Sequence, residues 1–571
     1  MSAPQDQPLL QTVHTLNQEL RRAAASSLYV TSKCCWTAFR TLFSAYRYTL
    51  DDVSQLDQDF STAVAAIREW RNSLLSINRL PPEVLSLIPN HLPHEVDLIH
   101  LCSVCRYWRK TFTQCATLWS KLTLTLGVSD LCITTWLQCA RNCPLDILST
   151  GSESAETLAL LHSRAQRFQN LCLIHNSWSD VQRFSVIASG PLPLLQSLTI
   201  HVTGFDPLDP EISSCPHYPL FTNAMRMTRF ILCAEGLPYL DYFAFTSLRT
   251  FELSVTPEGT FADEKAFPVH QLLDFLEATP TLEILTLAIY TETSLDRIPQ
   301  GRKAVLPNVK HYHVTELDPS YTIAMHISCS SAHHTSFVCE QNAEDPTPQD
   351  AFSATTTWHA VPPQNMAAHV DAIILELTAV EDVTCFVSFV SSGPTTFQLG
   401  YKIVTEEGYS DTPWRSLQIE YAEVISQASK LIRNHPFLAN IRRVHIRDRH
   451  SHLCPHLLPH ITNHIGQLFS SLGPLDDLVL ETSDLEPYLA PFLNIPDGTS
   501  SVFTCPQILV LTIVDNPQQC LNGDSEAGIV GFAKAQHSLG IPFEQVVLQL
   551  NNNSVKMAER LQTWVGSVRF Q

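Results

Sequence analysis

Residues 77–122 read INRLPPEVLSLIPNHLPHEVDLIHLCSVCRYWRKTFTQCATLWSKL. The stretch opens with signals for the start of a helix. Pro81 favours an extended conformation at Leu80, because its ring crowds the backbone of the preceding residue. Pro82 is compatible with the first position of a helix, and the acidic Glu83 complements the dipole of the first turn. We therefore predict that a short amphipathic helix begins at Pro82.

Apolar residues at helical spacing predict that two more helical segments follow. Leu85, Ile88 and Leu92 belong to the first helix, which Pro93 interrupts. One face of a second helix would comprise Leu98, Leu101, Cys102, Cys105 and Trp108, with Arg106, Arg109 and Lys110 in its last turns. A third, looser apolar group contains Phe112, Leu118 and Trp119. So short a segment buries too little surface to be stable alone, so it should pack against a partner or a neighbouring part of the chain.

These residues resemble the F-box, the three-helix module of ubiquitin-ligase substrate receptors. Three signatures occur in order: LPPE from Leu80, VCRYWR from Val104, and the pair Leu118-Trp119. Members of the family bind a Skp-type adaptor, which bridges to a cullin and its RING subunit. The resemblance implies an adaptor-binding edge that contains Leu80, Pro81, Leu85 and Ile88, with Val104, Cys105 and Trp108 packing the helices and completing that face. The alternative is a helical hairpin of a larger domain that only resembles an F-box.

Pro89 departs from the family pattern, which commonly has an aromatic or aliphatic residue at this place. A proline inside a helix removes one hydrogen bond and collides with the carbonyl four residues earlier, at a cost of about 3 kcal/mol. The first helix is therefore expected either to end near Ile88 or to be kinked there.

The charge of the chain argues against nucleic acid as a partner. The 571 residues carry 36 basic and 56 acidic side chains, for a net charge of −20. We find no strongly basic segment that could neutralise phosphates. Residues 78–121 hold five basic and three acidic side chains, so this block is faintly positive. That sign suits the acidic adaptors that the resemblance implies.

Hydropathy and cysteine usage predict a protein of the cytoplasm, the nucleus or both. The sequence shows neither a basic and apolar secretory signal nor an apolar run long enough to span a membrane. Its 17 cysteines are scattered, which is typical of reduced and mostly buried thiols. We therefore expect no membrane association.

Residues 1–77 read as helices. Leu9, Val13, Leu16 and Leu20 repeat at helical spacing, and Cys35 to Tyr46 contain a second stripe. Between Val53 and Ile77, apolar residues occupy four successive a/d pairs. This pattern is compatible with a dimeric coiled coil or with a helix that folds back on its neighbours. Trp70 at a d position, with uncharged residues at g, favours the second alternative.

The remaining residues, 123–571, contain a recurring set of three apolar positions spaced three and then two apart, as in leucine-rich repeats. The pattern starts at Phe168, Leu195, Met227, Leu248, Leu282, Val309, Val370, Trp414, Ile441, Leu475, Ile508 and Phe543. With 44% hydrophobic residues the pattern is also common by chance. Asn176, Asn516 and Asn551 add context, because each stands where such repeats place an asparagine.

The predicted architecture is therefore mixed α and α/β. It consists of an N-terminal helical region (1–77), an F-box (78–122) and an irregular leucine-rich-repeat-like strand/helix solenoid (123–571), with an irregular insertion near 316–415 that includes extended strands between Phe386 and Val404. The alternative for the last part is an ordinary α/β domain with a mixed sheet.

No phosphate loop, nucleophile elbow or dinucleotide fingerprint occurs, so we expect neither an enzyme nor a cofactor. Cys102 and Cys105 lack a second pair at zinc spacing. A polar cluster comprises His445, His450, His452, Cys454, His456, His460 and His464. We interpret it as a solvated face, with a metal site as the alternative. The sequence thus predicts a substrate receptor of a Skp/cullin/F-box ubiquitin ligase with an unknown protein target. An adaptor-independent scaffold and a metal-dependent enzyme are the alternatives.

Overall fold

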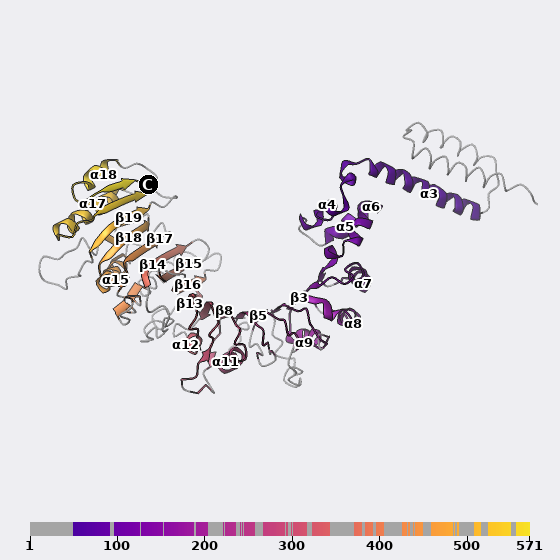
Figure 1. Ribbon diagram of the computed structural model, residues 1–571, viewed down its shortest axis with the longest axis horizontal. Helices are drawn as coiled ribbons and strands as arrows, with labels where there is room; N and C mark the ends of the chain where they lie inside the picture. The colour runs from indigo at the N-terminus through magenta and orange to yellow at the C-terminus, as the bar shows by residue number, and fades with distance from the viewer. Residues whose placement is uncertain are drawn as a thin grey trace, which may run out of the picture. The chain divides into compact units, whose positions relative to one another are not determined.

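The structure is a computed structural model. It describes residues between Leu50 and Phe570, with gaps of four residues or more at 92–95, 204–220, 236–239, 257–266, 317–321, 343–369, 392–395, 405–424, 434–437, 449–457, 490–506, 515–522 and 550–554 and shorter gaps elsewhere. The chain divides into two compact units, Met1–Ile147 and Leu148–Gln571, whose elements are labelled in Figure 1. The apolar stripes predicted between Leu9 and Tyr46 lie outside the described residues.

The first unit is mostly helical. Its elements are α3 (Leu50–Ser73), η1 (Ser76–Arg79), α4 (Pro82–Leu85), η2 (Ile88–His91), α5 (Val96–Val104), α6 (Arg106–Gln114), η3 (Ala116–Trp119), β1 (Lys121–Leu124) and α7 (Asp130–Cys139). β2 (Leu145–Ser149) spans the boundary between the units. Ser129 is the N-cap of α7, and its hydroxyl accepts a hydrogen bond from the backbone N–H of Cys132 at 3.3 Å. Such a cap satisfies one of the free N–H groups of the first turn.

The a/d stripe predicted between Val53 and Ile77 forms one helix, α3, which ends at Ser73. Ile77 therefore lies outside it, in η1. Ala63 is buried and Trp70 half-buried, whereas Phe60, Ile67 and Leu74 are exposed. Among the described residues, the d positions Ala63 and Trp70 are therefore covered by neighbouring side chains, whereas the a positions of the stripe remain in solvent.

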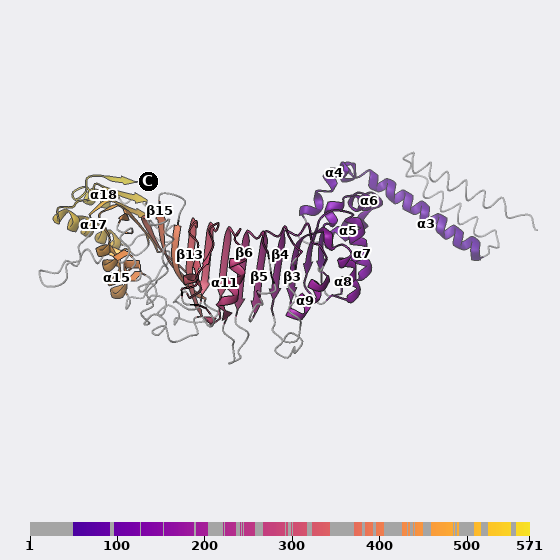
Figure 2. The ribbon, with the colours of Figure 1, turned by 60° about the horizontal axis from the view of Figure 1, so that its bottom comes forward.

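The second unit is built on a large, mostly parallel sheet. Starting from its N-terminal strand, hydrogen-bonded neighbours are β3 (Phe168–His175), β4 (Ser197–Val202), β5 (Arg229–Glu235), β6 (Thr250–Thr256), β8 (Ile284–Ile289), β11 (His311–Glu316), β13 (His334–Asn342), β16 (Thr396–Val404), β15 (Val383–Ser391), β14 (Val370–Ala379), β17 (Arg443–Asp448), β18 (Leu475–Thr482), β19 (Ile508–Val514), β20 (Gln545–Gln549) and β21 (Val568–Phe570). Figure 2 shows β3 to β13 side by side.

Helices connect many of these strands, as the parallel direction requires. They are α8 (Ala155–His162), η4 (Ala165–Arg167), α9 (Trp178–Ile187), α11 (Val269–Glu277), α12 (Thr322–Met325), α15 (Leu458–Ser471), α17 (Gly523–Ser538) and α18 (Val555–Leu561). Two short strand pairs accompany them: β7 (Phe267–Pro268) with β9 (Thr293–Ser294), and β10 (Ala304–Val305) with β12 (Ile327–Ser328). No helix in the described part of the chain is both long and apolar enough to cross a membrane.

The apolar triplets found in the sequence form the core of this sheet. Eleven of the twelve fall on β3, β4, β5, β6, β8, β11, β14, β17, β18, β19 and β20, and the triplet that starts at Trp414 lies outside the described residues. They also stand in register, since Leu198 pairs with Phe230, and Phe230 with Phe251. Residues between them are mostly half-buried or exposed, so one face of each strand packs inward.

Aromatic side chains fill the interior beneath β5 and β6. Phe230 is fully buried and lies 4.7 Å from Phe243, 5.2 Å from Phe245 and 5.6 Å from Phe251, measured between ring centroids. Phe275 of α11 contacts Phe251 at 4.7 Å. Such contacts attach α11 to the sheet by burial of apolar surface.

The prediction of a mixed α and α/β fold with N-terminal helices is confirmed at this level. The strands expected between Phe386 and Val404 are also confirmed, as β15 and β16. They form an antiparallel meander with β14, in which β16 pairs with β13 and β14 pairs with β17, both in parallel. Among the described strands from β3 to β21 of this sheet, only β15 therefore runs against the others.

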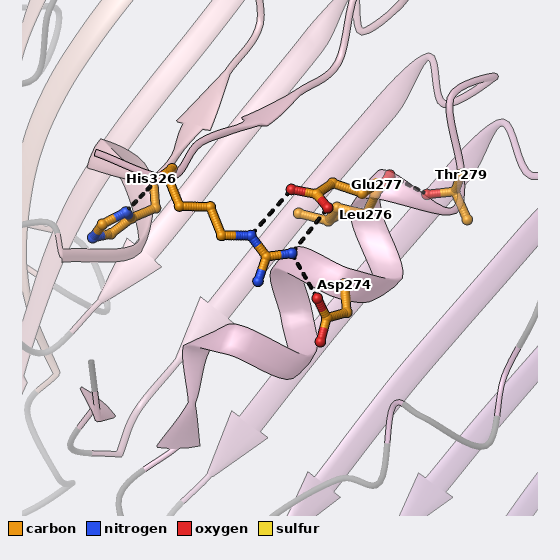
Figure 3. A network of polar contacts seen from close by, with 6 residues as sticks. Asp274, Leu276, Glu277, Thr279 and His326 are labelled. Carbon is orange, nitrogen blue, oxygen red and sulfur yellow. Dashed lines mark hydrogen bonds and ion pairs between the residues drawn. The ribbon is translucent and has the colours of Figure 1, made fainter. Parts of the chain in front are cut away.

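Arg302 ties α11 to the segment that follows β9. Its guanidinium donates to the carboxylate oxygens of Asp274 at 2.6 Å and of Glu277 at 2.9 and 3.3 Å. Both carboxylates raise the pKa of Arg302 above its ordinary value, Glu277 more than Asp274. The ring of His326 donates to the Arg302 carbonyl at 2.8 Å (Figure 3). Arg302 thus connects α11, the segment between β9 and β10, and the turn between α12 and β12.

Candidate functional site

The segment 77–122 starts as its sequence predicts. Leu80 is extended (φ −66°, ψ 141°), and Pro82 is the first residue of α4 with Glu83 in the first turn. The hydroxyl of Tyr107 in α6 donates to the carbonyl of Leu80 at 3.0 Å. This bond fixes the extended Leu80-Pro81 pair against α6.

The first helix ends before Pro89. α4 stops at Leu85, and Pro89 is the second residue of the 3-10 helix η2. At that position the backbone N–H would have no partner within the helix, so the missing donor of proline costs nothing there. Of the two outcomes expected for Pro89, the structure has the early helix end and no kink.

The prediction of one continuous second helix from Leu98 to Trp108 is wrong. α5 ends at Val104, and Cys105 is extended (φ −160°, ψ 170°) as the N-cap of α6. Its sulfur accepts a hydrogen bond from the N–H of Trp108 at 3.5 Å, which stabilises the start of α6. Arg106 consequently lies in the first turn of α6, where a cation is unfavourable, and Arg109 and Lys110 lie near the middle of that helix.

One of these cations is compensated by the neighbouring helix. The guanidinium Nε of Arg109 donates to the carbonyl of Cys102 in the last turn of α5, at 3.0 Å. A cation at a helix C-terminus is favourable, so Arg109 stabilises the break between α5 and α6. Arg106 forms an ion pair with Glu69 of α3 at 3.4 Å. Both of those side chains are mainly in solvent, so that pair contributes little.

The small core of this segment is aromatic and leucine-rich. Leu85, Leu98, Trp108, Phe112 and Trp119 are all buried. The rings of Trp108 and Phe112 meet edge to face at 5.5 Å, and the indole N–H of Trp108 donates to the Asn78 side chain in η1. The indole N–H of Trp119 donates to the Phe112 carbonyl at 2.8 Å. Trp108 therefore packs α6 against the entry to the segment, as predicted.

The seven predicted adaptor-binding residues fall into three groups by exposure. Leu85 and Trp108 are buried; Leu80, Ile88 and Cys105 are half-buried; Pro81 and Val104 are exposed. A buried Leu85 supports the core of the segment and offers little surface to a partner. Val104 was expected to pack the helices, but 55% of it is exposed. The role of the set in binding stays a prediction.

Three further apolar residues of the segment, outside the predicted set, are exposed. They are Val84 (45%) in α4, Leu87 (56%) in the turn after it and Ile99 (45%) in α5. Helical spacing could not identify them, because α4 is only one turn long and each of Val84 and Ile99 is next to a buried leucine. Apolar side chains that a domain leaves in solvent are candidates for contact with another protein.

Cys102 and Cys139 are not activated thiols. Burial raises the pKa of the Cys102 thiol, the nearby Cys139 raises it further, and Arg109 lowers it. Burial also raises the pKa of Cys139. Reactive cysteines have a depressed pKa, so neither thiol has the properties of a nucleophile.

The histidine cluster predicted between His445 and His464 is only partly described. His450, His452, Cys454 and His456 lie outside the described residues, as does the side chain of His460. His445 on β17 is 3.4 Å from both Arg447 Nε and Glu481, and His464 belongs to α15. The part of the chain that the structure describes contains no group of three or more His, Cys, Asp or Glu able to hold a metal ion.

Comparison with protein families agrees with the geometry of the segment. The model of the F-box-like family matches residues 77–125. This segment is an F-box-like domain. The match supports an F-box protein and indicates a role in protein interaction or in binding the adaptor of a cullin-type ubiquitin ligase. No curated protein matches the chain.

Proposed function

We propose that this protein is the substrate-receptor subunit of a Skp/cullin/F-box type ubiquitin ligase. The F-box-like domain would bind a Skp-type adaptor, and through it a cullin, while residues 148–571 would bind a protein destined for ubiquitination. The observation that carries the proposal is the family match at residues 77–125. The protein would act without covalent chemistry of its own, by holding its target near the ubiquitin-loaded enzyme.

The exposed apolar residues of the F-box-like domain support an adaptor interface there. Val84, Leu87, Ile99 and Val104 have 45–56% of their surface in solvent. The aromatic core of the domain does not use them. Burial of such side chains against a partner is favourable by about 25 cal/mol per Å² of apolar surface. The predicted Leu80 and Pro81 would extend this interface.

We also propose that the sheet of the second unit is an irregular leucine-rich-repeat-like array. Its support is the register of the apolar triplets. From β17 to β20 the middle positions Val444, Leu478, Leu511 and Val546 pair in succession. Asn176, directly after β3, accepts a hydrogen bond from Thr203 Oγ1 after β4 at 3.2 Å, which joins successive turns. Arrays of this kind present extended surfaces for protein partners.

Calorimetric titration of the full chain with a Skp-type adaptor tests the proposed function. Val104→Asp places a charge on an exposed position and should weaken adaptor binding by about 2–4 kcal/mol, as expected at an interface hot spot. Replacing Leu80 and Pro81 together by alanine should have an effect of similar size. Leu131→Asp is the matched control, because Leu131 of α7 is 77% exposed but lies outside the F-box-like domain.

The wild-type titration decides between the proposal and its alternative. Absence of measurable adaptor affinity would favour an adaptor-independent scaffold that uses only residues 148–571. Equal effects of Val104→Asp and Leu131→Asp would instead place the adaptor on a different surface of the first unit.

A further inference from the structure

A groove runs along the edge of the sheet at which the parallel strands begin. It has a volume of about 820 Å³ and is lined by residues that directly precede β4, β5, β6, β8 and β11. Five neighbouring strands about 4.8 Å apart span about 19 Å, the length of about six extended residues. The groove therefore matches a short peptide segment in size.

The apolar triplets build this groove. At β5, β6, β8 and β11 the first residue of the triplet stands two positions before the strand and is buried; these residues are Met227, Leu248, Leu282 and Val309. Their immediate neighbours on both sides line the groove. These pairs of lining residues are Arg226 and Thr228, Ser247 and Arg249, Thr281 and Glu283, and Asn308 and Lys310.

Hydrogen bonds between successive turns hold the floor of the groove in place. Ser247 Oγ donates to the Met225 carbonyl at 2.7 Å, Thr281 Oγ1 to the Leu248 carbonyl at 2.8 Å, and Asn308 Nδ2 to the Pro280 carbonyl at 2.9 Å. Arg226 occupies the equivalent position one turn earlier. Among the described residues it has no hydrogen bond or ion pair of its side chain.

The groove carries net positive charge in a protein whose net charge is −20. Its lining includes three basic residues, Arg226, Arg249 and Lys310, and one acidic residue, Glu283. Glu283 bridges two of the cations, with Lys310 Nζ at 2.7 Å and Arg249 Nη1 at 3.3 Å. The hydrogen bond from Lys310 and the charge of Arg249 lower the pKa of Glu283, so it stays ionised.

The cations remain accessible to a ligand. The side chains of Arg249 and Lys310 are 66% and 52% exposed, and Arg226 is exposed as well. Met225, at the rim, is 79% exposed and offers a flexible apolar surface. Hydroxyl and amide groups of the lining can bond a peptide backbone, so the chemistry suits an anionic chain that also has apolar side chains.

We propose that this groove binds an acidic, extended segment of the target protein, through Arg226, Arg249 and Lys310. The proposal rests on the proposed function, since it names the class of target that residues 148–571 would recognise. A nucleic acid is disfavoured, because three cations with one bound carboxylate provide little neutralisation and the surrounding protein is acidic.

Fluorescence polarisation of the full chain at low ionic strength tests the groove. The probe is a fluorescein-labelled peptide of about eight residues, long enough for the span above, in which Glu alternates with Ala around one Leu. The comparison probes have Lys in place of Glu, or are a single-stranded oligonucleotide. We expect binding of the acidic peptide, no binding of the lysine peptide, and weakening with added salt.

Arg226 is the position to change, because no described contact of its side chain is lost. Arg226→Glu should weaken acidic-peptide binding by at least about fivefold, since it removes one attraction and adds one repulsion. Arg226→Lys should stay within about twofold of wild type, because it keeps the charge. Arg560→Glu, on the exposed end of α18, makes the same change of net charge outside the groove and should have no effect. Circular dichroism checks that each variant is folded.

Several results would overturn the proposal: no acidic-peptide binding by the wild type, tighter binding of the oligonucleotide, or equal losses in Arg226→Glu and Arg560→Glu. Adaptor titrations on the same samples separate the two proposals. If the wild type binds the adaptor normally but does not bind the acidic peptide, the proposal for the groove alone is overturned. Normal peptide binding without adaptor affinity overturns the ubiquitin-ligase function alone.

Discussion

Replacing Trp108 by alanine should unfold the F-box-like domain locally within the intact chain. The indole is 6% exposed, meets Phe112 edge to face at 5.5 Å and donates its N–H to Asn78. Large-to-small changes of a buried tryptophan cost about 3–5 kcal/mol, and this includes the lost ring contact. The side chain of Asn78 also loses its hydrogen bond from the indole N–H, which adds about 1 kcal/mol to the loss of stability. We expect a total loss of about 4–6 kcal/mol.

Hydrogen exchange of the full chain measures this loss where it occurs. A loss of about 4 kcal/mol raises the opening equilibrium about 1,000-fold, since each 1.4 kcal/mol is a factor of ten. Peptides from α5 to η3 should therefore exchange faster by that factor, while peptides from residues 148–571 should be unchanged. Trp108→Phe keeps a buried ring but loses the hydrogen bond, so its effect should be about 1–2 kcal/mol.

Trp70→Ala is the matched control, because Trp70 is a half-buried tryptophan of α3. It should leave exchange in α6 and η3 within about tenfold of wild type, as expected for a change outside that core. The reasoning is refuted if Trp108→Ala also stays within tenfold, or if Trp70→Ala and Trp108→Ala have equal effects. Either result would mean that the contacts of Trp108 do not hold α6 to the entry of the domain.

Three further predictions concern the second unit. Phe230→Ala should lower stability by about 3–5 kcal/mol because it empties a fully buried aromatic site. Ile231→Ala, on the opposite face of β5, should cost under about 1 kcal/mol. Equal thermal midpoints for the two variants would contradict the inward assignment of Phe230. Burial, and then the neighbouring His334, lowers the pKa of His313, and burial lowers that of His334. Because a depressed histidine pKa destabilises the fold as pH falls below about 6.5, the thermal midpoint should drop towards pH 5 less in His313→Asn than in wild type; parallel curves would exclude this contribution. Arg302 and Glu277 should couple by no more than about 1 kcal/mol in a double-mutant cycle, because the pair is partly exposed, and a coupling that is unchanged at high salt would contradict an electrostatic origin.

The sequence predicted the strands of the second unit because each buries one face. Triplets such as Leu248/Phe251/Leu253 give both the period of two and the inward side. β13 was missed for a physical reason, since the polar Thr335 pairs with Tyr312 and stands at the middle position of the triplet, between the buried Ala332 and Phe337. A pattern that requires three apolar residues cannot identify a strand with a buried hydroxyl at its middle position.

The order of strands could not be predicted. β14, β15 and β16 form a meander that lies in the sheet in reverse order, so that β16 pairs with β13 and β14 pairs with β17. Every described strand of the sheet from β3 to β21, except β15, thereby keeps one direction. The sequence contains no signal for this order, because it depends on which strand edges pair. Local spacing determines only that extended strands occur there.

Within the candidate site, the sequence predicted the residues better than their geometry. Leu80 and Pro82 have the expected conformations, and Trp108 is buried. The single helical face predicted to contain both Leu101 and Trp108 is nevertheless wrong, because the two residues lie on different helices. Cys105 stands at helical spacing from its apolar neighbours in the sequence, but in the structure it is the N-cap of α6, where its sulfur accepts a hydrogen bond. Exposure of Val84 and Val104 depends on tertiary packing of one- and two-turn helices, which periodicity does not capture.

The position of the groove follows from the same residues that build the core. A buried residue two places before β5, β6, β8 and β11 fixes a turn, and its two neighbours then lie at the edge of the sheet. Repetition of the turn brings side chains from β4 to β11 together, although they are far apart in sequence. The net charge of −20 repels acidic chains at long range, so attraction to the groove has to come from cations in direct contact with the ligand. That combination favours a few well-placed carboxylates over a densely charged polyanion, and selectivity then results as much from repulsion by the rest of the protein as from the three cations.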